Sequence, residues 1–454
     1  MTDGPRFEPW KTLQFYANAG ERRELETFIE AIGPSEAFRS LLRLDASDRE
    51  RVLTTLSPAE AAEIMEEIPG EHAADFLERL PVGDAASIVS SMESAEQADL
   101  LADMHRDEAE AILAEMSPGH AADVRELIRY PRDVAGGLMV TEYLSFLETD
   151  TVSSVLDRLS EWVERWPNQD AQVYVVSPLG TLIGAVDLQD LVLSRRTLPV
   201  SEIVRPPRFV SVSFSLDELD SMFECHQLSA VAVVDDRQKL LGVLRRDDLN
   251  RALKERRDTD YLKSQGIVGG DEIRSLPVLT RTRRRLSWLS LNILLNIIAA
   301  SVIAVYEETL SAVIALAVFL PIVSDMSGCS GNQAVAVSMR ELSLGIVKPY
   351  EAARVWLQEV SVGLINGVIL GCLIAAAAWF WKGNLYLGVV VGTALACNTL
   401  VAVSLGGTIP LLLKRLKVDP AVASGPILTT VTDMCGFFLV LSIASLMLPN
   451  LVTG

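Results

Sequence analysis

Hydrophobic positions in the first third of the chain recur every 12 residues. Between residues 45 and 128, seven consecutive blocks, from DASDRERVLTTL to SPGHAADVRELI, carry an apolar side chain at the eighth and twelfth positions. A proline or a capping residue stands near the start of most blocks, as at a helix N-terminus. Each block therefore predicts a helix of about two turns, and helices this short must stack to be stable. Residues 1–130 are predicted to form an α-helical domain of short repeats, whose handedness the pattern leaves open.

The hydrophobic pattern then changes to two similar α/β segments, at residues 171–193 and 229–253. Each has a β-rich run, a turn, a short strand that is expected to end at a glycine, and a helix. An amphipathic helix is expected before each segment, near residues 152–166 and 216–227. The repeated pattern resembles tandem CBS domains, a regulatory module, and places them at residues 131–254.

The resemblance to CBS domains also bears on nucleotide binding. CBS units that bind adenosine nucleotides end a strand with G-x-x-[ST]-x-x-D, in which the hydroxyl and the aspartate hold ribose and phosphate. Here Asp187 and Arg245 stand at the hydroxyl positions, whereas Asp190 and Asp248 remain. Asp190 and Asp248 are thus the residues that would hold ATP, and the departure at the hydroxyl positions argues against ATP as a cofactor.

The last third of the chain contains apolar runs long enough to cross a bilayer, which takes about 20 residues. Residues 255–280 are predicted to be a connecting (plug) helix and linker, and residues 281–454 an α-helical membrane domain. Pro321 and the polar run 324–333 are expected to interrupt the second span, as in the broken helices that frame transporter sites. The five predicted transmembrane spans cover residues 286–306, 310–344, 356–381, 385–413 and 421–448.

Charge is distributed unevenly along this chain of net charge −20. Residues 1–280 carry a net −23, and the rest carries +3. Ten of the eleven basic residues after residue 280 fall on one side of the five spans. The positive-inside rule then places the N-terminus in the cytoplasm and the C-terminus outside, in a multi-pass protein of the cytoplasmic (inner) membrane. We expect no cleaved signal peptide.

An acidic cytoplasmic body disfavours nucleic acid as a partner and suits divalent cations. The five cysteines are odd in number and lack metal-site spacing, so they are expected to be reduced. We find no nucleophile–base set, phosphate-binding loop or His/Cys metal cluster in the sequence, and we therefore do not expect an enzyme.

Asp433 stands near the middle of the last apolar run. A carboxylate at that depth costs about 2.5–3.5 kcal/mol on insertion scales, so it normally faces the interior of a helix bundle or a water-filled path. Two interpretations remain open: an ion or proton site, or a buried acid that hydrogen-bonds to neighbouring helices. The default for intramembrane acids favours the ion site.

Three motifs, PRDVAGGLMV (131–140), SDMSGCSGNQA (324–334) and SGPILTTVTDMCG (424–436), occur in this order around the CBS-like units. Together they resemble the MgtE family of magnesium transporters over essentially the whole chain. The resemblance implies a homodimer in the lipid bilayer, with a pore on its axis and an aspartate that binds hydrated Mg²⁺. That aspartate corresponds to Asp433, and the expected ion pathway comprises Asp433, Asn332, Gly328, Asp325 and Thr429.

The resemblance further implies that Mg²⁺ closes the pore by bridging acidic faces of the cytoplasmic domains and the connecting helix. Two departures from the family pattern stand out. Cys329 stands where the family commonly has asparagine, which leaves the selectivity of the pore open. Arg256, Arg257 and Thr259 interrupt the acids of the connecting helix, which predicts weaker gating by Mg²⁺. For the acids of the repeat domain, a solvated face is the alternative interpretation. The regulatory candidates are Glu60, Glu96, Asp217, Asp248, Asp258 and Asp260.

The sequence thus predicts a Mg²⁺-selective, channel-like transporter that is driven by the membrane potential and gated by its acidic cytoplasmic domains. Three alternatives remain: Na⁺-coupled Mg²⁺ export, transport of another divalent cation such as Mn²⁺ or Co²⁺, and a non-conducting membrane sensor built on CBS domains.

Overall fold

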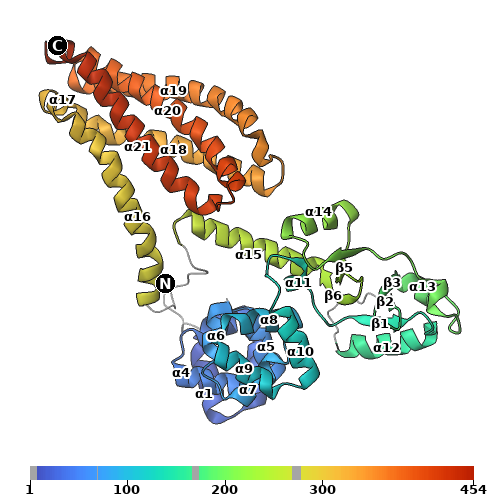
Figure 1. The fold of residues 1–454 in the computed structure, drawn as a ribbon. Helices are drawn as coiled ribbons and strands as arrows, with labels where there is room; N and C mark the ends of the chain where they lie inside the picture. Colours follow the sequence, from blue (N-terminus) through green and yellow to red (C-terminus); the bar gives the residue numbers. More distant parts are fainter. Residues whose placement is uncertain (1–7, 69, 166–172, 268–277, 454) are drawn as a thin grey trace, which may run out of the picture. The chain divides into compact units, whose positions relative to one another are not determined.

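The computed structural model describes residues 8–68, 70–165, 173–267 and 278–453. The chain divides into two compact units, Met1–Arg256 and Arg257–Gly454 (Figure 1). Helix α15 (Arg246–Ser264) begins in the first unit and ends in the second. The predicted boundary between the CBS pair and the connecting helix, at residues 254/255, therefore lies inside one continuous helix. Residues 268–277 of the predicted linker lie outside the described residues.

The N-terminal domain is a stack of short helices (Figure 1). The eighth residue of every 12-residue block is buried, from Val52 to Val124, which confirms the predicted period. Helices two apart in the chain pack together, so the apolar face of each helix is covered by its neighbours. The helices are α1 (Pro9–Ala19), α2 (Arg22–Ile32), α3 (Pro34–Leu41), α4 (Ala46–Thr55), α5 (Pro58–Glu66), α6 (Gly70–Leu77), α7 (Val82–Val89), α8 (Ser94–Asp103), α9 (Arg106–Glu115) and α10 (Pro118–Leu127).

Two three-stranded sheets of identical topology follow, which confirms the predicted repeat. In each sheet the first two strands are parallel and the last two antiparallel. The expectation that a strand ends at the glycine is wrong, because β3 and β6 both continue past Gly184 and Gly242. The first unit comprises β1 (Leu144–Leu147), α12 (Val152–Arg165), β2 (Val173–Val176), β3 (Leu182–Val186) and α13 (Leu188–Leu193), and the second β4 (Phe209–Ser211), α14 (Leu216–His226), β5 (Ala230–Val234), β6 (Leu240–Arg245) and the start of α15.

The N-terminal domain and the second α/β unit share one hydrophobic core. The short helix α11 (Ala135–Leu138) and Met139 lie in this core between them. Val140 and Val243 exchange both backbone hydrogen bonds at 2.9 Å, which ties the connecting segment to β6. A side chain in place of Gly242 would meet Met139 at 2.8 Å, so the close approach requires glycine here.

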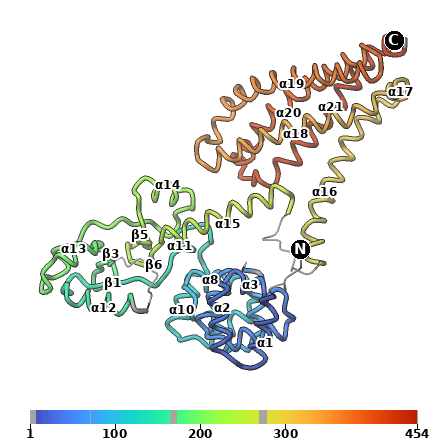
Figure 2. The backbone as a smooth tube through the Cα atoms, turned by 180° about the vertical axis from the view of Figure 1, so that it is seen from behind, coloured from blue at the N-terminus to red at the C-terminus, as the bar shows by residue number. Residues whose placement is uncertain are grey.

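The second unit is a helix bundle in which α20 is the central helix (Figure 2). Among the described residues, four helices are long and apolar enough to cross a membrane: α16, α19 together with the turn before it, α20 and α21. The bundle comprises α16 (Val278–Val305), α17 (Glu307–Ala312), α18 (Leu316–Ser343), α19 (Ala352–Lys382), α20 (Leu385–Arg415), α21 (Pro420–Leu446) and α22 (Leu448–Thr453).

The predicted break in the second span is wrong, because α18 is one continuous helix of 28 residues that includes Pro321. Gly331 of its polar run allows close helix packing instead. A Cβ on Gly406 of α20 would lie 2.2 Å from the Gly331 carbonyl oxygen of α18. Small residues let membrane helices approach in this way. Two of its serines donate to carbonyl oxygens of their own helix, Ser327 to Val323 at 2.7 Å and Ser330 to Met326 at 3.1 Å.

Candidate ion site in the membrane helices

Asp433 lies at the middle of α21 and is half-buried. Its Oδ1 accepts a hydrogen bond from the Ser324 hydroxyl of α18. Asp325, the next residue of α18, is close enough to act on Asp433 electrostatically. The carboxylate thus sits where α18 and α21 pack together, with one oxygen held by a hydroxyl and a second acid nearby.

The buried side-chain amide of Asn398 contacts the residue that precedes Asp433. Asn398 of α20 is fully buried, and its Nδ2 donates to the Thr432 carbonyl at 3.0 Å. Among the described residues, neither Asn398 Oδ1 nor the Thr399 hydroxyl has a hydrogen-bond partner, although both atoms are buried. A Cβ on Gly436 would lie 2.7 Å from Asn398 Nδ2, so glycine at 436 makes room for the amide. Buried polar atoms without hydrogen-bond partners are rare in proteins. Asn398 Oδ1 and the Thr399 hydroxyl are therefore candidates for contact with a ligand or a water molecule in this part of the bundle.

One face of α18 is polar and exposed in the single chain. Asp325, Cys329 and Asn332 recur at helical spacing and are all exposed, as is Gln333. Gly328 is buried beside this face, and an added Cβ there would be 3.9 Å from the Thr432 hydroxyl of α21. Of the five predicted pathway residues, the structure therefore places only Gly328 and Asp433 at the packed contact of α18 and α21.

The remaining pathway candidate, Thr429, lies one helical turn before Asp433 on α21. It is exposed, and its hydroxyl donates to the Gly425 carbonyl at 2.8 Å. Ser324 and Asn398, which the structure brings to Asp433 and its neighbour Thr432, were missed by the sequence analysis. An asparagine within the apolar run of α20 was the signal that could have found Asn398.

Three of the six cytoplasmic regulatory candidates pair with arginines. Glu96 contacts Arg251, and Arg251 also donates to Asp248 at 2.8 Å. Asp217 accepts from Arg256 at 2.8 Å. These acids therefore carry their own counter-ions within the first unit.

The other three candidates are placed differently. Glu60 forms a hydrogen bond with the Ser57 hydroxyl at 2.9 Å, and burial together with the Glu26 carboxyl raises the pKa of Glu60. Asp258 and Asp260 lie on the part of α15 that belongs to the second unit, and Asp260 is 4.0 Å from the Lys263 amine. Within the first unit, Glu96 and Asp248 share Arg251, whereas Glu60 and Asp217 have other partners.

The nucleotide candidates are also paired with arginines. In the first α/β unit, Arg205 contacts Asp190 at 2.6 Å and Asp187 at 2.7 Å. In the second unit, Arg245 Nε donates to Asp248 at 2.7 Å. Both carboxylates that would bind a ribose are thus already occupied by guanidinium groups.

Comparison with known proteins yields three family matches along the chain. Residues 32–133 match the MgtE intracellular N domain, residues 200–255 a CBS domain, and residues 320–443 MgtE, described as a divalent cation transporter. The chain is 32% identical over 336 residues to the magnesium transporter MgtE of Enterococcus faecalis, covering 73% of both chains. The chain belongs to the MgtE family.

A further MgtE relative agrees with this assignment. The magnesium transporter MgtE of Thermus thermophilus is 32% identical over 337 residues, covering 73% of this chain and 74% of the relative. A crystal structure of the cytosolic domain of the Mg²⁺ channel MgtE in complex with ATP is 28% identical, with a TM-score of 0.48, and covers 53% of this chain and 99% of that one. The MgtE match at residues 320–443 includes Ser324, Asn398 and Asp433.

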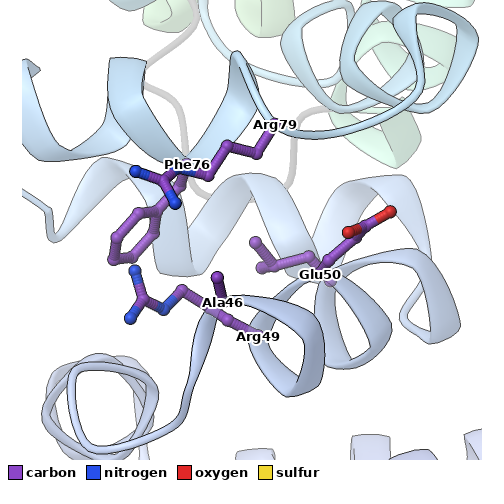
Figure 3. Close-up of a pocket in the computed structure, with 6 residues that line it drawn as sticks. Ala46, Arg49, Glu50, Phe76 and Arg79 are labelled. Atoms are coloured by element: carbon purple, nitrogen blue, oxygen red, sulfur yellow. The ribbon is translucent and has the colours of Figure 1, made fainter.

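Two other features of the MgtE N domain are less suited to ion transport. Glu78, His105 and Glu108 bring three potential metal ligands together, but Glu78 accepts from both the backbone and Nδ1 of the exposed His105, as in a helix cap. A small pocket between α4 and α6 places the Arg49 and Arg79 guanidinium groups close to the Phe76 ring (Figure 3). Arg49 lies 4.3 Å from the ring centroid, and two arginines disfavour a cation in this pocket.

Proposed function

We propose that the protein is a Mg²⁺-selective, channel-like transporter of the cytoplasmic membrane, and that Asp433 binds the ion. The observation that carries this proposal is a half-buried carboxylate at the middle of α21, beside the exposed polar face of α18. Mg²⁺ gives up its water reluctantly and is usually held by one or two carboxylates with several waters retained. The relatives are named magnesium transporters, which supports the same ion.

In this proposal α18 also crosses the membrane, as the second span in chain order, which brings the number of spans to five. Its 28 residues measure about 42 Å at 1.5 Å per residue, enough to cross a bilayer with some tilt. Its polar face lowers its hydropathy, but its buried face packs against α20 and α21. With five spans, the basic residues after residue 280 gather on one side, so the N-terminus is cytoplasmic and the C-terminus outside.

The transporter is proposed to be a homodimer. Asp325, Asn332 and Gln333 are exposed in the single chain, and such side chains are costly when they face lipid. A second copy that covers this face of α18 would enclose a polar path between the two chains. Two Asp433 carboxylates would then face one path, which suits a hydrated divalent cation.

Helix α15 is proposed to be the connecting element that gates the path. Near its C-terminus, Lys263 donates to Asp419 at 3.0 Å. Asp419 caps α21, because its Oδ1 accepts from the Ala421 backbone at 2.9 Å. A movement of α15 would thus reach the helix that carries Asp433. Glu96, Asp217 and Asp248 are already paired with arginines, so intracellular Mg²⁺ is proposed to act through Glu60 and Asp258.

One observation favours a second candidate, transport of a softer divalent cation. The Cys329 thiol lies on the same exposed face of α18 as Asp325 and Asn332, and thiolates prefer softer metals than Mg²⁺. Purified protein in liposomes, loaded with a Mg²⁺-sensitive or Mn²⁺-sensitive dye, separates the two candidates. We expect Mg²⁺ entry that follows an inside-negative potential and does not need a Na⁺ gradient. Entry of Mn²⁺ or Co²⁺ without Mg²⁺, or flux only with a Na⁺ gradient, would overturn the proposal in favour of the alternative.

A further inference from the structure

The N-terminal domain and the second CBS unit meet along a seam that is polar at its edge and apolar inside. Val52 of the repeat domain and Leu244 and Leu249 of the CBS unit belong to one continuous cluster of buried residues. An apolar core of this kind needs no ion to hold it together. The polar edge of the seam, formed by α8, β6 and the start of α15, decides how the docking responds to cations.

Arg245, the last residue of β6, is the centre of this edge. Its two terminal nitrogens donate to both oxygens of the Glu93 carboxylate, one at 3.1 Å. Its Nε donates to Asp248 Oδ2 at 2.7 Å. The side chains of Arg245, Glu93 and Asp248 are only 15%, 21% and 9% exposed. A bidentate guanidinium–carboxylate pair at this burial is among the stronger polar contacts in proteins.

Arg251, one turn and a half further along α15, makes a second contact of the same kind. It contacts Glu96 of α8 and donates to Asp248 Oδ1 at 2.8 Å. Two arginines of the CBS unit thus hold two acids of the N domain, and Asp248 holds both arginines. We call these five residues the arginine clamp: Glu93, Glu96, Arg245, Asp248 and Arg251.

A third connection beside the clamp consists of hydrogen bonds around Ser94. The Ser94 hydroxyl, fully buried, donates to Glu142 at 2.8 Å and accepts from the Thr141 backbone at 2.8 Å. The Ser94 backbone donates to Glu142 as well, at 3.2 Å. Exchange of the Ser94 and Thr141 amides with solvent therefore reports directly whether the seam is closed.

We infer that the arginine clamp takes the place of a divalent cation at this seam, so that the N domain stays docked on the second CBS unit whether or not Mg²⁺ is present. The three carboxylates of the clamp are the ligands that Mg²⁺ would need, and each of them is already paired with a guanidinium group. A cation would have to displace both arginines to bind there. Regulation by Mg²⁺ must then act at other acids, and in that respect the inference rests on the proposed function.

Hydrogen–deuterium exchange of the full-length protein in detergent tests the inference. In wild type, the Ser94 and Thr141 amides should exchange at the same rate in excess EDTA and in millimolar Mg²⁺. In the double variant Arg245→Gln/Arg251→Gln, the three acids lose their counter-ions and repel. Exchange in EDTA should then rise by about tenfold or more, and Mg²⁺ should slow it again by binding the freed carboxylates.

Arg256→Gln is the matched control, because Arg256 lies on the same helix but pairs with Asp217 inside the CBS unit. It should leave both amides unchanged. If EDTA alone speeds exchange in wild type, Mg²⁺ and not the clamp closes the seam, and the inference is wrong. If the double variant exchanges like wild type in EDTA, the arginines contribute nothing to docking. Should the double variant fail to fold, Arg251→Gln alone, which alters the half-exposed arginine, must still speed exchange in EDTA.

These results are independent of transport. A protein that conducts no Mg²⁺ in liposomes but shows the predicted exchange would refute the proposed function and keep the clamp. A protein that conducts Mg²⁺ but opens its seam in EDTA would refute the clamp and keep the proposed function.

Discussion

Replacing Gly406 of α20 by alanine tests whether α18 is the continuous, closely packed helix that the structure shows. The ideal Cβ of an alanine at this position would lie 2.2 Å from the Gly331 carbonyl oxygen and 3.1 Å from the Ala334 Cβ, both on α18. Ordinary contact begins at 3.4 Å. Because the nearest atom belongs to a backbone, the two helices must separate by about 1 Å, which disturbs the packing around the crossing.

The expected cost follows from this overlap. Overpacking a close-packed interior typically costs about 1–3 kcal/mol, and alanine regains only about 0.5–1 kcal/mol through its higher helix propensity. In a unit of this size, 1 kcal/mol shifts the melting temperature by about 2–4 °C. Gly406→Ala should therefore lower the apparent melting temperature of the membrane unit by several degrees.

Gly425 of α21 provides the matched control, because no described atom lies within 4 Å of an added Cβ. Gly425→Ala should leave stability unchanged or raise it slightly. The assay is thermal unfolding of the purified full-length protein in detergent, measured as the loss of the monodisperse peak in size-exclusion chromatography after heating. Equal melting temperatures for the two variants would refute the close crossing of α18 and α20 and restore the interrupted span that the sequence suggested.

Three further predictions concern the cytoplasmic domains and their connection. Burial raises the pKa of Glu142 above its ordinary 4.5, so its ionised form costs stability as the pH rises above that value; Glu142→Gln should raise the melting temperature more at pH 8 than at pH 5, and an equal change at both would contradict this. Lys263→Gln removes the contact to Asp419, and should reduce the effect of intracellular Mg²⁺ on flux in liposomes while maximal flux persists; unchanged regulation would show that α15 does not act through this pair. Because Arg205 occupies Asp190, titration calorimetry should detect no ATP binding in wild type, and heat of binding that Asp190→Ala abolishes would contradict the prediction.

Much of the fold follows from local patterns in the sequence. The 12-residue repeat predicts its buried positions, such as Ile64 and Leu100, because a short amphipathic helix has one apolar face whatever it packs against. The two α/β units are recognisable for the same reason. The break in α18 was predicted wrongly because glycine and serine serve two purposes in membranes: they loosen a backbone, and they let helices approach closely. The close contact of Gly331 with α20, which only the structure shows, indicates that here the glycine serves helix packing and not a break in the helix.

The partners of charged residues were harder to predict. Asp433 stood out because a single acid in an apolar run is costly, but Ser324, 109 residues away, could not be assigned to it from spacing. Glu96 and Asp248 were predicted to face a regulatory metal, and in the structure both also contact Arg251, which the sequence did not indicate. Glu93 and Arg245 are 152 residues apart, and no pattern along the chain connects them. An acidic residue can be recognised in the sequence as a candidate site, whereas the basic residue that pairs with it is decided by the tertiary fold.

The central claim is that the Asp433 carboxylate binds the transported ion, and Asp433→Asn tests it most directly. The substitution keeps the shape of the side chain, and an amide still accepts from Ser324, so the bundle should assemble as in wild type. Glu308→Gln, which neutralises an exposed acid of α17, serves as the control. We predict that Mg²⁺ flux into liposomes is lost in Asp433→Asn and retained in Glu308→Gln. Selective Mg²⁺ flux through a folded Asp433→Asn protein would contradict the account.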